Sequence, residues 1–413
     1  MSSLTYISLT KPTTGPTQAE LAVQNAPKRK ARRLNGLRAK SALPNHAKRR
    51  IVRGLLADRY LVLAGLMEEL ADRGRPVGTK EGPTAEEAVE MASNLDLRAP
   101  TKEPVHLVPT LRRNGKLRWV YTFGLLEAAR QRLLHQVSRA AAESHPAQFN
   151  VRGRAQLETW FGAVLPNAQL VITTDIPDCF NRIRKDVVGS GLPFSGQVMK
   201  AALFDTKGRA KPLKPKLKSS PLKTEAIHCS NEQNTVPMSS PQRGIPQGSA
   251  FAQDVSDALI KEVLEAVEAS ASGVHAAAWG DNLIFVLKDA SVLSQVQNAL
   301  TSAVQARFGV DVIGELIDRI VERKATVPFF FCGRTYRFTK GKLRSTTPED
   351  RIDNFGVRLE AKIADALQTG DPSPAVRSLS GWLSQNRDCP KVRKAALRFA
   401  AEITDLFGIK CLT

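Results

Sequence analysis

Residues 243–260 read RGIPQGSAFAQDVSDALI and join a glycine-containing turn directly to a helix. Gly244, Pro246 and Gly248 mark the turn, because glycine and proline are the residues that most often interrupt regular structure. From Ser249 onward the apolar residues recur at helical spacing through residue 270, which predicts one long amphipathic helix. A serine nucleophile is the competing chemical interpretation, and it is disfavoured because no GxSxG elbow surrounds Ser249.

Two aspartates stand at the ends of predicted strands on either side of this helix. QLVITTDI (169–176) is a short apolar, β-branched run that carries Asp175 to its tip, as a buried strand does. HAAAWGDNLIFVLKD (275–289) predicts a hairpin with the Gly-Asp-Asn of residues 280–282 at its turn. Together the two carboxylates, Asp175 and Asp281, would hold hard divalent cations, because Mg²⁺ prefers oxygen ligands. Taken singly, an aspartate at a strand end is more typical of a helix cap or a turn.

Further strands and helices surround this centre. VHLVPTLRRNGKLRWVYTF (105–123) predicts a hairpin, because Asn-Gly between apolar runs is the strongest short-range hairpin signal. Two amphipathic helices are expected over residues 51–98, the second starting at a capping box, Thr-Ala-Glu-Glu. Another helix is expected over 125–143, and residues 186–204 are also expected to be helical. The strand pair FFFCG and RTYRFTK precedes a helical C-terminus.

The composition excludes several classes of protein. The 413 residues carry 60 Lys and Arg against 40 Asp and Glu, a net charge of +20, which argues for a polyanionic partner. A hydrophobic content of 42% excludes a wholly disordered chain. The five scattered cysteines favour reduced thiols over a zinc site or a disulfide framework. We expect no membrane interaction and a cytoplasmic protein, because the chain has neither a long apolar run nor a signal peptide.

An ordered set of motifs resembles one known family. The segments NGKLR, FNVRGR, DIPDCFNRI, RGIPQGSAFAQ, WGDN, RKAT and FFFCG occur in this order. The series is similar to the bacterial reverse transcriptases, the group that includes group II intron, retron and abortive-infection enzymes. It spans about Pro104 to Phe338, and its Pro-Gln-Gly turn is the most specific block. Asn282 departs from the pattern, because the family usually has a second aspartate there.

The resemblance implies an α+β fold of the right-hand polymerase type, with fingers, a ferredoxin-like palm and a helical thumb. On this basis residues 1–60 form a basic N-terminal arm and helix, and 61–165 form the fingers. Residues 166–340 form the palm, with a basic loop over 205–242, and residues 341–413 form the thumb. Between Lys28 and Arg59 the segment carries many basic residues and a single acid, so nucleic-acid contact is favoured over a solvated face.

The resemblance also implies roles for individual residues. Asp175, Asp281 and Ile176 would be the metal ligands, with Mg²⁺ as the cofactor and Mn²⁺ as its alternative. Asn282 would coordinate or hydrogen-bond through its carbonyl without adding charge. Lys324 would be the general acid that protonates pyrophosphate. The predicted catalytic residues are therefore Asp175, Asp281, Asn282 and Lys324.

A second set would bind the substrate. Phe180 would lie against the sugar and exclude a 2′-hydroxyl, with an ordinary core phenylalanine as the alternative. Gln247 and Gly248 would lie beneath the nascent base pair. The predicted triphosphate or template contacts are four cationic residues: Lys116, Arg118, Arg152 and Arg154. For Lys116 and Arg118 the alternative is that they lie at the solvated tip of a hairpin.

The resulting hypothesis is an RNA-directed DNA polymerase, a nucleotidyltransferase that adds dNTPs to a primer 3′-hydroxyl by a two-metal mechanism. Its partners would be an RNA template, a DNA or RNA primer and dNTPs, with a structured non-coding RNA and an oligomer left open. An RNA-directed RNA polymerase and a catalytically impaired RNA-binding relative are the alternatives. Because only 80 residues follow Gly333, a bacterial antiviral defence enzyme is favoured over a complete mobile-element enzyme by analogy.

Overall fold

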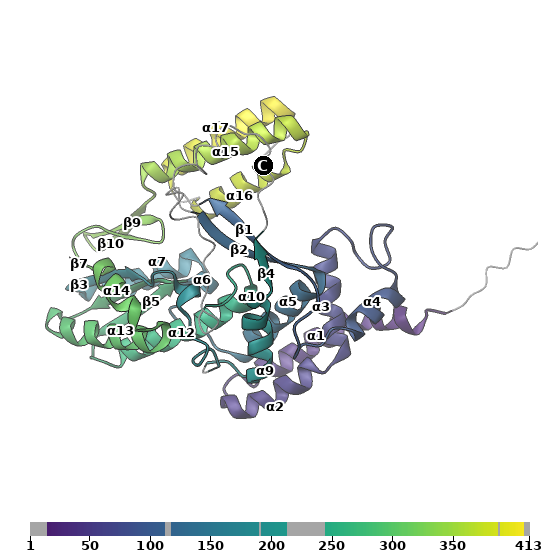
Figure 1. The fold of residues 1–413 in the computed structure, drawn as a ribbon. Coiled ribbons are helices and arrows are strands. Elements are labelled where there is room, and N and C mark those ends of the chain that lie inside the picture. The colour runs from purple at the N-terminus through teal and green to yellow at the C-terminus, as the bar shows by residue number, and fades with distance from the viewer. Residues whose placement is uncertain (1–14, 112–116, 190, 213–243, 387–388, 409–413) are drawn as a thin grey trace, which may run out of the picture. The chain divides into compact units, whose positions relative to one another are not determined.

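The computed structural model describes residues 15–111, 117–189, 191–212, 244–386 and 389–408. Lys116, the Asn114–Gly115 turn, Arg243 and most of the predicted basic loop lie outside the described residues. The described chain mixes helices and sheets, so the mixed class predicted from the sequence is confirmed (Figure 1). The assignment of fingers, palm and thumb stays a prediction.

The chain divides into two compact units. The first unit comprises Met1–Thr110, Arg118–Glu143 and Val188–Val255, and the second comprises Leu111–Leu117, Ser144–Val187 and Ser256–Thr413. Both units are discontinuous in sequence, whereas the predicted domains were continuous. The predicted palm, 166–340, is divided between them.

Helices dominate the first unit. Its N-terminal helices are α1 (Gln18–Arg38), α2 (Asn45–Leu56), α3 (Arg59–Asp72) and α4 (Ala85–Ser93), and α5 spans Leu125–Ala141. Helix α3 is buried on nearly all sides between Leu61 and Leu66, and α1 and α5 both pack against it. Helix α4 begins at the predicted capping box: Thr84 Oγ1 accepts from Glu87 N at 3.2 Å, and Thr84 N donates to the Glu87 carboxylate at 2.8 Å.

A small sheet completes the first unit, in the order β2-β1-β4. The predicted strands are present as β1 (Val105–Leu111) and β2 (Leu117–Phe123). Strand β4 (Ala210–Pro212), parallel to β1, was not predicted, because three residues in a Lys/Pro-rich run carry no alternating pattern. The helix predicted over 186–204 was too long, because Gly191 and Pro193 interrupt it. Only α9 (Gly196–Met199), a π-helix (Lys200–Asp205) and α10 (Thr206–Gly208) form.

A four-stranded antiparallel sheet organises the second unit. Its strands are β3 (Leu170–Asp175), β5 (Val274–Trp279), β6 (Asn282–Leu287) and β7 (Val321–Lys324). Helix α12 (Ala250–Glu268), the long helix predicted after the turn, precedes β5, and α13 (Leu293–Phe308) follows β6. The spatial order is β7-β3-β6-β5. With the intervening helices, this is the β-α-β-β-α-β connection of ferredoxin-like folds.

Aromatic packing joins this sheet to a second, smaller sheet. The latter has the order β10-β9-β8 and contains the predicted strands β8 (Phe329–Phe331) and β9 (Arg334–Thr339), with β10 at Lys342–Thr346. Phe161, from helix α7 (Arg154–Val164), lies 4.8 Å from Tyr336 and 5.4 Å from Phe329, measured between ring centroids. The same core includes Ile284 and Val286 of β6.

Three C-terminal helices form a bundle with its own core. They are α15 (Glu349–Thr369), α16 (Ser373–Asn386) and α17 (Pro390–Phe407), and they lie side by side (Figure 1). Phe355 and Trp382 stack with ring centroids 3.9 Å apart and planes 8° apart. The helical C-terminus predicted from the sequence is thus present. No helix in the described part of the chain is long and apolar enough to cross a membrane.

Candidate active site

Strand pairing brings the two predicted metal-binding aspartates together at one end of the two central strands of the four-stranded sheet. Strands β3 and β6 are antiparallel, and Asp175 lies opposite Asn282 in their register. Beyond the last pair, Ile176 N donates to the carbonyl oxygen of Asp281 at 3.0 Å. The side chains of Ile172 and Ile176 are fully buried and anchor β3 in the core. Residues 106 positions apart in the sequence therefore meet at the tips of adjacent strands.

A tight turn positions Asp281. Trp279 pairs with Asn282, so only Gly280 and Asp281 connect β5 to β6. Gly280 has φ +62°, the conformation that a two-residue II′ hairpin turn requires at its first central position. Asn282 Nδ2 donates to Asp281 Oδ1 at 3.2 Å and to the carbonyl oxygen of Trp279 at 3.4 Å. The amide of Asn282 thus supports the Asp281 carboxylate in this structure.

Asp175 carries an ion pair that was not predicted. Arg319 Nη1, at the end of α14 (Ile313–Arg319), lies 2.8 Å from Asp175 Oδ2. Both side chains are about half exposed, at 47% for the arginine and 41% for the aspartate, so solvent screens the pair. The Arg319 guanidinium group thus contacts one of the two carboxylate oxygens of Asp175.

Further carboxylates lie near Asp281, around the thiol of Cys179. Burial raises the pKa of the Cys179 thiol above its usual range, and the carboxylates of Asp281, Asp257 and Asp178 raise it further. Carboxylates that oppose ionisation of a nearby thiol also attract cations, because both effects come from the same potential. Cys179 is buried with its sulfur 3.4 Å from Ser256 Oγ, so it is a structural thiol rather than a ligand.

The donor set fits one kind of cation and not another. Within the described ranges, no three Asp, Glu, His or Cys side chains are grouped to hold a metal. Asp175 and Asp281 therefore offer two carboxylates, and Ile176 offers only its main chain because its side chain is apolar and buried. Mg²⁺ commonly uses one or two carboxylates together with substrate phosphates. Among the described residues, the chemistry of the two carboxylates is thus compatible with a Mg²⁺ ion that takes its other ligands from outside the protein.

Phe180 follows Asp175 closely in the sequence, just after the end of β3. It follows a left-handed residue, Asp178, with φ 53° and ψ 34°, and belongs to the short helix α8 (Cys179–Arg182). Its side chain is only partly buried, whereas Cys179 beside it is fully buried. Aspartate is one of the few residues that adopt the left-handed conformation readily. The turn therefore places Cys179 in the core and leaves part of the Phe180 ring accessible.

The Pro-Gln-Gly turn belongs to the first unit, where it lies against strand β2. Tyr121 N donates to the carbonyl oxygen of Gln247 at 2.7 Å. Gly248 has φ +109°, and a Cβ atom there would lie 2.7 Å from Tyr121 O and 2.8 Å from a methyl group of Val120. Only glycine fits this position. Gln247 is partly exposed and Gly248 is exposed, so the outer surface of the turn is accessible.

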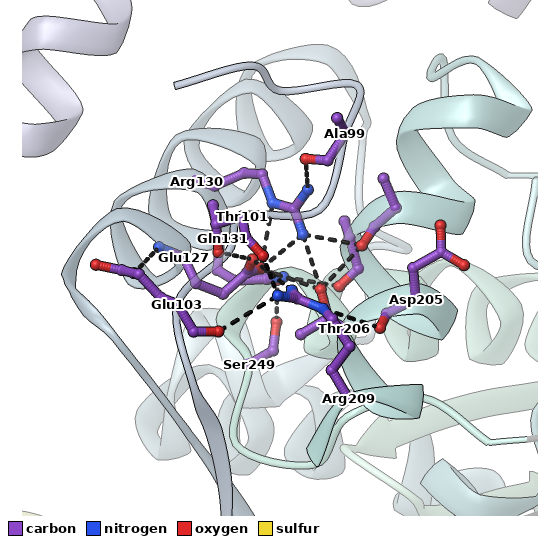
Figure 2. Close-up of polar contacts among 12 residues, drawn as sticks. Ala99, Thr101, Glu103, Glu127, Arg130, Gln131, Asp205, Thr206, Arg209 and Ser249 are labelled. Atoms are coloured by element: carbon purple, nitrogen blue, oxygen red, sulfur yellow. Dashed lines mark hydrogen bonds and ion pairs between the residues drawn. The ribbon is translucent and has the colours of Figure 1, made fainter. Parts of the chain in front are cut away.

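A buried network holds the end of this turn to α5 (Figure 2). Ser249 Oγ donates to Gln131 Oε1 at 2.5 Å and accepts from Ala252 N at 3.1 Å. Gln131 Nε2 donates to Glu127 Oε1 at 2.8 Å and to the carbonyl oxygen of Ala202 at 2.7 Å. Gln131 and Ser249 are both buried. Ser249 is therefore a structural anchor for the turn and for the start of α12.

Glu127 and Arg130 form the ionic centre of the network. Both side chains are fully buried, and Arg130 Nη2 lies 2.8 Å from Glu127 Oε1. The same Arg130 nitrogen donates to the carbonyl oxygen of Ala201 at 2.8 Å and to Thr206 Oγ1 at 2.7 Å. Ala201 belongs to the π-helical segment, whose irregular backbone is stabilised by these side chains (Figure 2).

The predicted cationic contacts are only partly described. Lys116 lies outside the described residues, and Arg118 belongs to β2. Arg152 is exposed at the end of α6 (Phe149–Arg152). Arg154 has internal partners: it donates to Tyr336 Oη and to the carbonyl oxygen of Cys332, both at 3.0 Å. Arg154 therefore stabilises the β8–β9 hairpin, which does not fit the substrate contact expected of it.

The prediction for Lys324 is wrong. Lys324 pairs with Leu170 in the β3–β7 ladder, at the opposite end of β3 from Asp175. At roughly 3.3 Å per residue, the five residues from Leu170 to Asp175 correspond to about 17 Å. A lysine side chain does not span that distance, so Lys324 is not the general acid at this site. Continuing the same register past Val321, which pairs with Thr173, brings Arg319 to Asp175 instead.

Two features were missed for identifiable reasons. Finding Arg319 requires recognising β7 as a strand, but VERK has no apolar alternation and all four residues are exposed. The buried network was not predicted because Glu127, Arg130 and Gln131 resemble ordinary surface residues of a helix. The available signal was their spacing of three and four, which places them on one helix face.

No family model and no curated protein matches the sequence. Two solved structures are similar to this chain: Candida albicans telomerase with a fragment of telomeric RNA, and apo telomerase of Candida tropicalis truncated from its C-terminal domain. The first has 11% identity and a TM-score of 0.35, covering 78% of this chain and 61% of that chain. The second has 12% identity and a TM-score of 0.34, covering 63% and 60%. The chain spans about three fifths of the length of these telomerase chains, and a likeness this distant supports no argument about function.

Proposed function

We propose that the protein is a template-directed nucleotidyltransferase, and specifically an RNA-directed DNA polymerase. The observation that carries the proposal is the meeting of Asp175 and Asp281 at one sheet edge, through the β3–β6 register and the Ile176–Asp281 hydrogen bond. The motif resemblance predicts the same two residues as metal ligands. The net charge of +20 supports nucleic acid as the partner.

The protein's own residues would bind and orient the reactants. Asp175 and Asp281 would hold Mg²⁺ or Mn²⁺, which supplies charge neutralisation at the transferring phosphoryl group. Asn282 would keep the Asp281 carboxylate oriented through its Nδ2 hydrogen bond. The accessible part of Phe180 would meet the sugar and favour a deoxyribonucleotide. The outer surface of the Gln247–Gly248 turn would support the base pair being formed.

Removing either carboxylate tests the proposal. Asp175→Asn and Asp281→Asn preserve size and remove charge, so we expect dNTP incorporation on a primed RNA template to fall about a hundredfold or more. Asp289→Asn is the matched control, since Asp289 is an exposed residue just beyond β6. Full activity of both site variants would refute the polymerase assignment.

An RNA-directed RNA polymerase is the second candidate, and Asn282 is the observation that favours it, because a Gly-Asp-Asn turn also resembles some viral RNA polymerases. The same assay with rNTPs in place of dNTPs distinguishes the two enzymes. Incorporation of rNTPs alone would select the RNA polymerase. RNA binding without incorporation under either Mg²⁺ or Mn²⁺ would select the impaired relative.

A further inference from the structure

A cavity in the first unit lies among three segments that the sequence keeps far apart. It has a volume of about 290 Å³ and lies between α2, the turn around Arg98 and residues 193–198. A second cavity, of about 170 Å³, shares Leu56 and Arg98 with it. The larger cavity is close to the lower limit for a small-ligand site, which suits one nucleotide and not a duplex.

Three arginines line this cavity, and they have no acidic partner among the described residues. Arg49 and Arg53 are four residues apart on α2, and therefore on the same helix face. Arg98 comes from the turn that follows α4. Other arginines nearby are neutralised: Arg29 and Arg33 both lie within 3.5 Å of the Asp58 carboxylate. Asp96, in the adjoining cavity, accepts from Arg98 N at 2.8 Å, but no ion pair joins it to a guanidinium group among the described residues. The three arginines therefore leave a net positive charge at the cavity.

The rest of the lining is apolar with a few polar groups. Val52 and Val198 are buried, at 1% and 2% exposure, and Leu56 and Pro193 extend this apolar surface. Gln197 and Ser195 supply amide and hydroxyl groups at the rim. The lining of the cavity therefore combines three arginines with apolar and polar side chains.

We propose that this cavity binds one phosphorylated nucleotide unit of a single-stranded nucleic acid. The planar forks of Arg49, Arg53 and Arg98 match phosphate oxygens in pairs. The base would lie on the surface of Val52, Leu56 and Val198, with guanidinium planes available for stacking. The inference goes beyond the proposed polymerase activity and does not depend on it, because binding here requires neither of the active-site aspartates.

Fluorescence anisotropy with the full chain and a short labelled single-stranded RNA tests the proposal. Arg49→Gln, Arg53→Gln and Arg98→Gln should each weaken RNA binding about fivefold or more, because each removes a charged group that binds phosphate. The slope of log K against log salt should become shallower by about 0.7 for each phosphate that a variant no longer neutralises. The matched control is Arg50→Gln, an exposed arginine of α2 that does not line the cavity and should change affinity less than twofold.

Three probes separate the sources of the phosphate. A 5′-phosphorylated RNA, the same RNA with a 5′-hydroxyl, and free AMP as competitor distinguish a strand end, an internal phosphodiester and a free nucleotide. With either RNA, selective loss of binding in the three cavity variants supports the proposal, whereas binding of free AMP without binding of RNA would overturn it. Equal losses in all four variants would overturn it in favour of diffuse surface charge, and so would unchanged binding in the cavity variants. RNA binding is measured without dNTPs and without any incorporation step, so failure of the polymerase assignment leaves this test valid.

Discussion

Arg319 is the residue whose role is clearest from geometry alone. Its guanidinium group pairs with Asp175 Oδ2, an oxygen that would otherwise be available to a cation. The ion pair is half exposed, and pairs of this kind contribute about 0–1 kcal/mol. Arg319 is therefore a weak competitor for the site and not a permanent block.

Arg319→Gln should bind Mn²⁺ more tightly than the unmodified protein, by a factor of about two to five. The reason is that the cation no longer displaces an arginine from Asp175. Titration followed by the electron paramagnetic resonance signal of free Mn²⁺ measures this directly. Arg323→Gln, an exposed arginine on β7, is the control and should leave the affinity unchanged. Weaker binding in Arg319→Gln would mean that the arginine assists the site.

Gly248→Ala should destabilise the protein by about 1–3 kcal/mol from its positive φ alone, because an L-residue resists that conformation. The clash with the carbonyl oxygen of Tyr121 adds to this cost. Gly54→Ala is a matched control in the same unit, since its Cβ would meet open space within α2. There the same substitution should be neutral or stabilise by up to about 1 kcal/mol. Urea denaturation measures the free energy of unfolding of both variants. Equal stability of Gly248→Ala and Gly54→Ala would contradict the predicted backbone strain at Gly248.

Helix α5 is the element on which the first unit depends for its polar interior. Its Glu127, Arg130 and Gln131 contact the π-helical segment and the start of α12. These side chains donate to the carbonyl oxygens of Ala201 and Ala202 in the π-helical segment, and accept from Ser249 just before α12. The helix thus acts as a support for two irregular segments.

Glu127→Gln should cost about 3–5 kcal/mol, because it leaves the fully buried charge of Arg130 without its counter-ion. The free energy of unfolding from chemical denaturation measures the loss. An exposed glutamate of α4 offers the comparison, and Glu90→Gln should change stability little. A small effect for Glu127→Gln would show that Thr206 and the backbone carbonyls suffice to compensate Arg130.

Across the whole molecule, stability should vary with pH in a defined alkaline window. Burial lowers the pKa of Lys207 from 10.5 to about 8. Above pH 8 the unfolded chain therefore holds more protons than the folded one, so the free energy of unfolding should rise by at most about 1.4 kcal/mol per unit. Near pH 10 a second group should oppose this rise in the free energy of unfolding. Burial raises the pKa of Tyr121 to about 12, so the tyrosine loses its proton in the unfolded chain before it does so in the folded protein.

Comparison with Lys207→Met isolates this effect. The variant should lose the rise in stability between pH 8 and 10, as followed by thermal unfolding across that range. Lys211→Met, at an exposed position on β4, should keep it. A parallel pH profile for the unmodified protein and Lys207→Met would refute the role of Lys207.

Sequence reasoning was most successful where a pattern is local. The helix after the Pro-Gln-Gly turn, the capping box at Thr84 and the hairpin around Asp281 all have short-range causes. It failed where tertiary pairing decides: Lys324 was placed at the wrong end of β3, and Arg319 was not recognised. Strand β7 has no apolar pattern of its own, and only its pairing with β3 makes it a strand. The interleaving of the two units has no local signal either.

The Gly280–Asp281 turn limits how this chain can vary in length. Strand β6 is fully buried from Leu283 to Leu287, so its sequence has no alternation of polar and apolar residues that would fix its register against β3. The length of the turn is then what keeps Asp281 beside Ile176. Inserting or deleting one residue there should move the Asp281 carboxylate away from Asp175. A change in the length of this turn should therefore disturb the candidate site, whereas surface loops elsewhere can lengthen at little cost.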